Sequence, residues 1–136
     1  MSFPTTISLT ARVDMQDSLA RFVTNKQWPA VRVRWGDQSR EHRFTRPDEQ
    51  HRFTMTARLP RGEHDLTLEF MERTPVQGAV EIVSLHCQGT PMGLEIYRCE
   101  YTTWETDSTE QSHLYMGRPG VWRLRLGVPR GGAGFV

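Results

Sequence analysis

The sequence predicts an all-β fold: an antiparallel two-sheet β-sandwich or jelly roll of about eight strands with at most one short helix. Apolar and polar residues alternate with a period of two in five separate runs, as side chains do on the two faces of a strand. Turn residues separate these runs, and a single short segment has a helical pattern. At 136 residues, the chain has the length of one domain.

Each regular run has one apolar face and one polar face. In the first run, Ile7 and Leu9 alternate with Ser8 and Thr10. An antiparallel sheet gives this pattern when one face packs on a core and the other meets water or a partner. We therefore predict strands at residues 7–14, 31–35, 53–59, 65–70 and 122–128.

Three less regular segments complete the predicted sheets. Residues 78–87 and 93–101 carry apolar side chains at both parities, which is typical of strands that are central in a sheet or covered on both sides. Residues 40–46 alternate weakly around His42 and Phe44 and are predicted to form an edge strand.

Turn residues mark the boundaries of these strands. Gly36 separates two of them, and Pro60-Arg61-Gly62 separates two more, because proline and glycine favour tight turns. The one helical candidate covers residues 19–23, with Asp17 or Ser18 as its cap. A loop explains this short segment nearly as well.

The polar and glycine-rich segments define the rest of the organisation. Residues 102–113 have no apolar period and are predicted to be an exposed loop. We expect a single β-sandwich domain at residues 1–128, followed by a Gly-rich C-terminal arm at residues 129–136.

The charge balance and the cysteines narrow the classes of function. The chain has 17 basic and 16 acidic residues, a net charge of +1, and this balance does not favour a protein that coats nucleic acid. No apolar run approaches the roughly 20 residues that cross a bilayer, and no basic and apolar leader opens the chain. We expect neither a membrane span nor a secretory signal. Cys87 and Cys99 lack the spacing of a zinc site and are predicted to be buried thiols.

Residues that commonly support catalysis do not form a recognisable motif. The sequence contains no Gly-x-Ser-x-Gly motif, and we expect a protein without enzyme activity and without a cofactor. His42 and His51 can face each other across a hairpin, but a metal site there needs further ligands. Glu69 and Glu81, on predicted neighbouring strands, favour an ordinary charged sheet face over an acid and base pair.

Calcium is the one cofactor that the acidic residues leave open. Asp14 with Asp17, and Glu105 with Asp107, offer hard oxygen ligands. Neither pair has the dense alternation of acidic residues that a dedicated calcium loop has. We therefore predict no cofactor and keep calcium as the alternative.

Arginines are the first group of candidate contacts with a partner or ligand. The polar faces of the predicted strands carry Arg12, Arg32, Arg34, Arg58, Arg123 and Arg125. Arg32, Arg34, Arg123 and Arg125 are the candidates for an interface. They form a basic stripe if their strands adjoin, or else pair with acidic residues across strands.

Aromatic residues are the second group. Trp35 and Trp122 lie at core parity and are predicted to be buried. Trp28 lies in a loop and Trp104 in the polar stretch, where each can stack on a sugar or anchor a protein interface, or else pack within its loop. Phe135, in the C-terminal arm, is a further candidate contact.

Three segments, in order, resemble strands of small phage virion β-sandwiches. Residues 62–70 (GEHDLTLEF) are similar to their G-x-H-x-L-x-I-x-F strand, and residues 79–85 (AVEIVSL) look like their A-x-x-I-x-x-I strand. Residues 114–124 (LYMGRPGVWRL) resemble their Y-L-G-x-x-G-x-W-x-L signature. The resemblance covers roughly residues 60–126, and the hydrophobic continuation after the last strand is replaced here by PRGGAGFV.

The resemblance implies a non-enzymatic structural protein located in the virion, as a head decoration, neck or tail component. It would act through contacts with other virion proteins, in a homo-oligomer or multi-copy assembly. These virion proteins also resemble calcium-dependent xylan-binding carbohydrate modules, which share the sandwich and carry their ligand site on loops. A carbohydrate-binding module that takes a glycan, with or without calcium, is therefore the alternative function.

Overall fold

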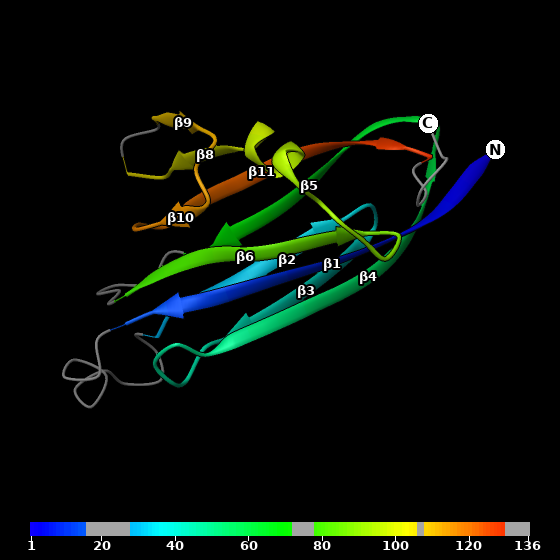
Figure 1. The fold of residues 1–136 in the computed structure, drawn as a ribbon. Coiled ribbons are helices and arrows are strands. Elements are labelled where there is room, and N and C mark those ends of the chain that lie inside the picture. Colours follow the sequence, from blue (N-terminus) through cyan, green and yellow to red (C-terminus); the bar gives the residue numbers. More distant parts are fainter. Residues whose placement is uncertain (16–27, 72–77, 106–107, 130–136) are drawn as a thin grey trace.

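The protein is built from two antiparallel sheets that pack face to face (Figure 1). The computed structural model describes residues 1–15, 28–71, 78–105 and 108–129. The strands of the five-stranded sheet are β1 (Ser2–Asp14), β4 (Gln50–Pro60), β6 (Ala79–Cys87), β7 (Thr90–Pro91) and β10 (Tyr115–Met116). The strands of the six-stranded sheet are β2 (Ala30–Trp35), β3 (Gln38–Arg43), β5 (Gly62–Phe70), β8 (Glu100–Thr103), β9 (Thr109–Gln111) and β11 (Gly120–Val128).

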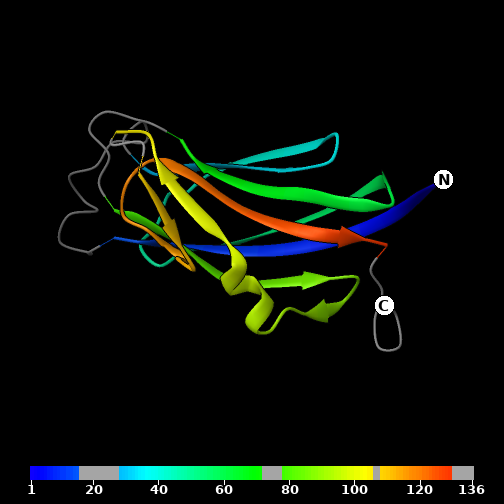
Figure 2. The same cartoon turned by 90° about the horizontal axis from the view of Figure 1, so that it is seen from above.

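The strand order confirms the predicted sandwich. One sheet runs β10-β6-β1-β4, with β7 paired to β6, and the other runs β3-β2-β5-β11-β8-β9. The strands beyond the predicted eight or so are short ones such as β7 and β10, of two residues each. The one helix in the described part of the chain is a short 3₁₀ helix, η1 (Leu94–Arg98) (Figure 2).

The alternation in the sequence corresponds to burial in the structure. Along β4, Phe53, Met55 and Ala57 are buried, while the residues between them are exposed. Along β11, Trp122 and Leu124 are buried in the same way. The apolar faces of both sheets meet in one core, and removing this surface from water is the main contribution that stabilises the fold.

A β-bulge explains the mixed pattern of β6. Ser84 pairs with Thr10 of β1, but Ile82 pairs with the very next residue of β1. Val83 is the extra residue between them and is exposed, whereas Ile82 and Leu85 both face the core. β6 is central in its sheet, between β10 and β1, as one of the two predicted alternatives states. The other alternative, that both faces are covered, is wrong, because a bulge, not double burial, places apolar residues at both parities.

The segment 93–101 is divided between η1 and the start of β8. Ile96 and Cys99 are buried and lie three residues apart, the repeat of a 3₁₀ helix. The Ile96 N–H donates to the carbonyl of Gly93 (3.2 Å). The predicted strand is therefore wrong over most of this segment, since its buried residues repeat every three positions.

The polar stretch 102–113 contains a small hairpin formed by β8 and β9. The hydroxyl groups of Thr102 and Thr109 are 2.8 Å apart across it, and all three residues of β9 are exposed. The predicted loop is therefore wrong here, although the predicted exposure of this end of the stretch is right. No apolar period marks β9 because neither of its faces covers the core.

The remaining segments have mixed outcomes. β3 lies at the edge of the six-stranded sheet, as predicted, although the strand ends at Arg43. The candidate helix at residues 19–23, and the C-terminal arm beyond Pro129, lie outside the described residues. No helix in the described part of the chain is long and apolar enough to cross a bilayer.

Two tryptophans of the six-stranded sheet fill the centre of the core. The indole N–H of Trp35 donates to the carbonyl of Thr5 on the opposite sheet (3.0 Å). The indole N–H of Trp122 is also buried but has no hydrogen-bond partner among the described residues. The Cys99 thiol lies beside the Trp122 indole N–H, but the two do not meet hydrogen-bond geometry. Burial raises the pKa of the Cys99 thiol.

These two environments give a paired prediction. Trp122→Ala is expected to lower the free energy of unfolding by about 3–5 kcal/mol, because it leaves a large cavity. Trp122→Phe is expected to cost less than Trp35→Phe, since only Trp35 loses a hydrogen bond, typically about 0.5–1.5 kcal/mol. Urea unfolding followed by circular dichroism measures both differences, and the reverse order for the two Phe variants would contradict this account.

Candidate functional site

The predicted arginine stripe is not continuous. Arg12 lies on the five-stranded sheet, whereas Arg32 and Arg34 on β2 are separated from Arg123 and Arg125 on β11 by the intervening strand β5. Strand β5 carries acidic residues on the same outer face, so the arginines pair across strands instead of forming one basic surface.

The four candidate arginines differ in their partners. Arg32 pairs with Glu41 and Glu69 on the two neighbouring strands. The acidic partners of Arg125 are Asp65 at 3.3 Å and Glu63 at 3.9 Å, and Arg123 lies 3.9 Å from Asp65. Arg34 is exposed and lies between Ser39 and Thr67 in the sheet register.

The aromatic candidates separate into three cases. Trp28 is buried, with 4% of its surface exposed, and belongs to the core, which agrees with the predicted alternative of packing and not with that of a ligand contact. It lies two residues before the start of β2. Trp104 is half exposed, and Phe135 lies outside the described residues.

The candidate histidine pair meets at one side of the sandwich, where the edge strands β3 and β4 face each other. The rings of His42 and His51 stack with centroids 3.8 Å apart. The Nε2 atom of His42 is hydrogen-bonded to Glu49 (2.7 Å), so it is already engaged. Within the described residues no group of three metal-ligating side chains forms.

The acidic candidates are also dispersed. Glu69 and Glu81 lie in different sheets, so the prediction that they are neighbours is wrong. Asp14 accepts a hydrogen bond from the Tyr115 hydroxyl, and Glu105 pairs with Arg118. Asp17 and Asp107 lie outside the described residues. Neither candidate calcium pair is therefore tested by the described residues.

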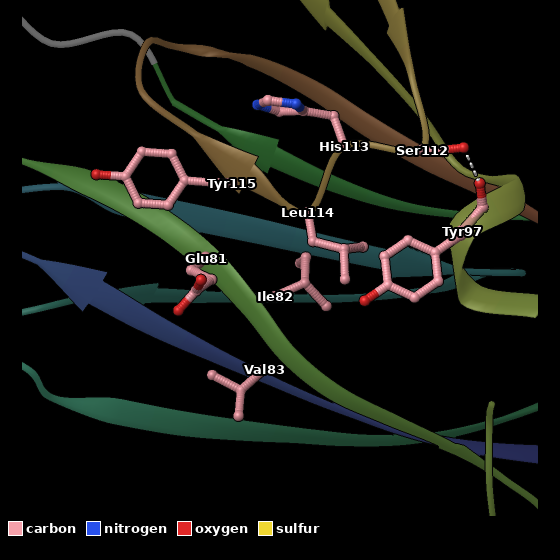
Figure 3. Close-up of a pocket in the computed structure, with 8 residues that line it drawn as sticks. All are labelled: Glu81, Ile82, Val83, Tyr97, Ser112, His113, Leu114 and Tyr115. Carbon is pink, nitrogen blue, oxygen red and sulfur yellow. Dashed lines mark hydrogen bonds between the residues drawn. The ribbon is translucent and has the colours of Figure 1, made fainter. Parts of the chain in front are cut away.

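The structure instead reveals an open groove beside β6, with a volume of about 420 Å³ (Figure 3). We call it the tyrosine groove. The residues that line it are Glu81, Ile82, Val83, Tyr97, Ser112, His113, Leu114 and Tyr115. Figure 3 shows Tyr97 and Tyr115 at opposite ends, with Ile82 and Leu114 between them.

The bulge in β6 and the short strand β10 shape the middle of this groove. Val83, the bulged residue, is 44% exposed and forms one wall. The Ile82 N–H donates to the carbonyl of Leu114 (2.8 Å), and Tyr115 pairs with Glu81 in the sheet. The apolar floor is therefore held by backbone hydrogen bonds, which is how sites gain a fixed geometry.

The end at Tyr115 is polar. Its hydroxyl donates to Asp14 (2.8 Å), and this hydrogen bond, with burial, raises the pKa of Tyr115. Arg12 pairs with Glu81 (3.1 Å) and with Asp48 (2.7 Å). Because the Tyr115 hydroxyl stays protonated and already donates, its oxygen is left as an acceptor for a ligand hydroxyl.

The end at Tyr97 is fixed by η1 and the segment before β10. The Ser112 hydroxyl donates to the Tyr97 carbonyl (2.6 Å), and the Ser112 N–H donates to the Cys99 carbonyl (2.9 Å). The ring of His113 stacks on Tyr101 and its Nδ1 atom lies 3.3 Å from Glu110. The Tyr97 side chain itself is 48% exposed.

Sequence reasoning did not single out Tyr97 or Tyr115. Tyr97 lies within the predicted strand at residues 93–101, and Tyr115 is part of the segment 114–124 that resembles the C-terminal signature. The residue type was the only sequence feature that could have indicated them as site residues, because tyrosine is enriched at sites with one apolar side and one side in water. Their arrangement depends on η1 and on the bulge, which the alternation of residues does not predict.

Comparison with known proteins identifies the fold. The chain matches no family model, and no curated protein matches it. A solved structure of vCBM60, from work on a circular permutation linking two families of calcium-dependent carbohydrate-binding modules, is 14% identical, with a TM-score of 0.56 over 88% of this chain and 89% of that one. The complex of vCBM60 with galactobiose is 11% identical, with a TM-score of 0.52 over 90% and 97% of the two chains. The fold is the one that vCBM60 has.

The histidine pair generates a prediction about acid stability. Burial, then the nearby His42, lowers the pKa of His51. Burial tends to raise the pKa of Glu49, but hydrogen bonds from the Thr45 N–H and from His42 lower it overall. Both groups have a lower pKa in the folded protein than in the unfolded chain, so the unfolded chain binds their protons more tightly. Their contribution to stability is therefore fully present above the unfolded pKa, and it is lost as the pH falls toward the folded pKa.

We therefore expect the free energy of unfolding to fall as the pH is lowered from about 7 to about 5, the range in which an unfolded histidine takes up its proton. His51→Gln should flatten this part of the profile, because glutamine does not titrate. His86→Gln, on β6 and away from the pair, is the matched control and should keep the decline. Urea unfolding at several pH values measures it, and an unchanged slope in His51→Gln would refute the assignment.

Proposed function

We propose that the protein is a carbohydrate-binding module and that the tyrosine groove binds a glycan. The observation that carries the proposal is the pair of half-exposed tyrosines, Tyr97 and Tyr115, at the two ends of an apolar floor. The similarity to vCBM60, whose complex with galactobiose is known, supports it as a likeness of fold.

The chemistry of a sugar matches that of the groove. The C–H faces of a pyranose ring are apolar and pack on an aromatic ring, while the hydroxyl groups at the rim need hydrogen-bond partners. The tyrosine rings and Val83 supply the apolar contacts. Glu81 and the Tyr115 hydroxyl supply acceptors for sugar hydroxyl groups at one end. Two ring platforms suit an oligosaccharide more than a single sugar.

The proposal does not place calcium in the groove. Asp14, the calcium candidate nearest to it, accepts a hydrogen bond from Tyr115. The acidic groups of this region are also engaged with Arg12. Binding in the tyrosine groove is therefore expected to persist when a chelator removes divalent cations.

Alanine variants of two equally exposed aromatic residues test the proposal. Tyr97 and Trp104 are each 48% exposed, but only Tyr97 lines the groove. Tyr97→Ala is expected to weaken glycan binding at least about tenfold, whereas Trp104→Ala leaves it unchanged. Affinity gel electrophoresis with xylan, galactan and glucan, with and without EDTA, measures the affinities. Loss of binding in Trp104→Ala alone would move the site to Trp104 and overturn the proposal.

A second proposed function is a structural component of a virion, present in many copies. It is favoured by the three segments that resemble phage virion β-sandwiches, which coincide with β5, β6 and the β10–β11 region. In this function the outer sheet faces contact other virion proteins or further copies of the chain. A glycan site on such a component is compatible with this function, because the tyrosine groove occupies one side of the sandwich.

Self-association tests this second proposal. A virion component of this kind is expected to form discrete oligomers as its concentration rises, because its contacts serve a repeated assembly. Sedimentation velocity between micromolar and millimolar concentrations measures the distribution of species. A monomer throughout that range, with unchanged glycan binding, would count against assembly and leave the carbohydrate function standing.

A further inference from the structure

A second hollow, smaller than the tyrosine groove, is lined by three arginines. Its volume is about 200 Å³, and its lining residues are Arg98, Glu100, Arg123 and Arg125. We call it the arginine groove. Arg98 belongs to η1, Glu100 begins β8, and the other two arginines lie on the outer face of β11.

The ends of two elements create this hollow. β8 pairs with β11 only from Gly120 to Arg123, whereas β11 continues to Val128. Beyond Arg123, no described strand pairs with this edge of β11. The side chains of Arg123 and Arg125 therefore border a space with no neighbouring strand. Arg98 of η1 lines the opposite side of this space.

The residues that line the groove itself favour an anionic ligand. They are three arginines and one glutamate, and two further carboxylates, Asp65 and Glu63, pair with Arg123 and Arg125 beside the groove. The pairs of Arg123 and Arg125 with Asp65 are exposed and 3.3–3.9 Å long, and exposed ion pairs of this kind are weak because water and salt screen them. Arg98 forms no ion pair with the residues that the structure describes. Guanidinium groups bind carboxylate or sulfate oxygens through paired hydrogen bonds, and these weak exposed pairs can exchange for such a ligand.

The two grooves share η1. Tyr97 lines the tyrosine groove and Arg98 lines the arginine groove. Their Cα atoms are about 3.8 Å apart, as for any consecutive residues, and a 3₁₀ helix turns about 120° per residue, so their side chains point in different directions. The two grooves therefore adjoin at η1, and a sugar chain that crosses η1 would contact both.

We propose that the arginine groove binds an acid group, a carboxylate or a sulfate ester, carried by the glycan that occupies the tyrosine groove. The ligand is then an acidic polysaccharide. This inference rests on the proposed carbohydrate function and adds the substrate class to it.

The acidic neighbours of the arginines favour a polysaccharide over a nucleic acid. Glu100 lies in the groove, and Asp65 and Glu63 lie beside it. Proteins that bind a nucleic-acid backbone present a continuous basic surface, and these carboxylates interrupt the basic surface here.

The test compares neutral and acidic polysaccharides on the full chain. Affinity gel electrophoresis uses galactan as the neutral ligand, polygalacturonate for carboxylates and dextran sulfate for sulfate esters. At least one acidic polymer is expected to bind at least tenfold more tightly than galactan at low salt. The double variant Arg98→Gln/Arg123→Gln should remove this preference. The matched control Arg40→Gln/Arg61→Gln, which removes the same charge from exposed sites elsewhere, should keep it.

Each outcome separates this inference from the proposed function. If neutral and acidic polymers bind equally, and Tyr97→Ala abolishes this binding, the proposal for the arginine groove is overturned and that for the tyrosine groove is supported. An acidic preference that both double variants lose equally would overturn the proposal for the arginine groove too, because general charge would then explain binding. If only Arg98→Gln/Arg123→Gln loses the preference for acidic polymers, the inference is supported. If Tyr97→Ala keeps that preference, the two grooves do not bind the same ligand and the inference is overturned. Binding of no polymer would overturn both proposals.

Discussion

The pairing of β1 with both β4 and β6 holds the five-stranded sheet together and fixes the tyrosine groove. β1 runs through that sheet for 13 residues. Its buried face carries Ile7, Leu9 and Ala11, and a slip of one residue would turn them all to solvent, so the register is strongly specified. With that register set, the extra residue of β6 has to project outward as Val83. The last residue of β1, Asp14, then lies within reach of Tyr115. The groove is thus a consequence of how the core strands pair.

The regular strands could be predicted because a half-buried strand leaves its period in the sequence. β4 and β11 each bury every second side chain, so the alternation alone locates them. η1 and β9 could not be predicted in this way. The buried residues of η1 repeat every three positions within a segment of only five, and β9 covers no core, so it has no apolar residue to reveal it. The register of a strand also cannot be predicted from the local pattern. A bulge and a strand buried on both faces both place apolar residues at odd and even positions, so the sequence does not distinguish them.

The candidate site was harder to predict than the fold because exposure is decided by distant parts of the chain. Trp28 and Trp104 look equivalent in the sequence, since both lie in polar connections. One is buried at the end of the core and the other is half exposed. Glu69 and Glu81 look like neighbours, yet they belong to opposite sheets. Tyr97 and Tyr115 come together only because η1 and β10 meet beside β6. Residue type indicated what these side chains can do, while the topology determined which of them line the same groove.

The position of β3 at the edge of its sheet has a consequence for the behaviour of concentrated protein. An edge strand exposes unpaired backbone groups that can recruit a strand of another molecule and begin a fibril. Exposed charged residues, Arg40 and Glu41, lie on β3, and bringing two such edges together would bury charge at a cost that few backbone hydrogen bonds offset. The charges on β3 therefore oppose strand-to-strand pairing of two molecules through this edge.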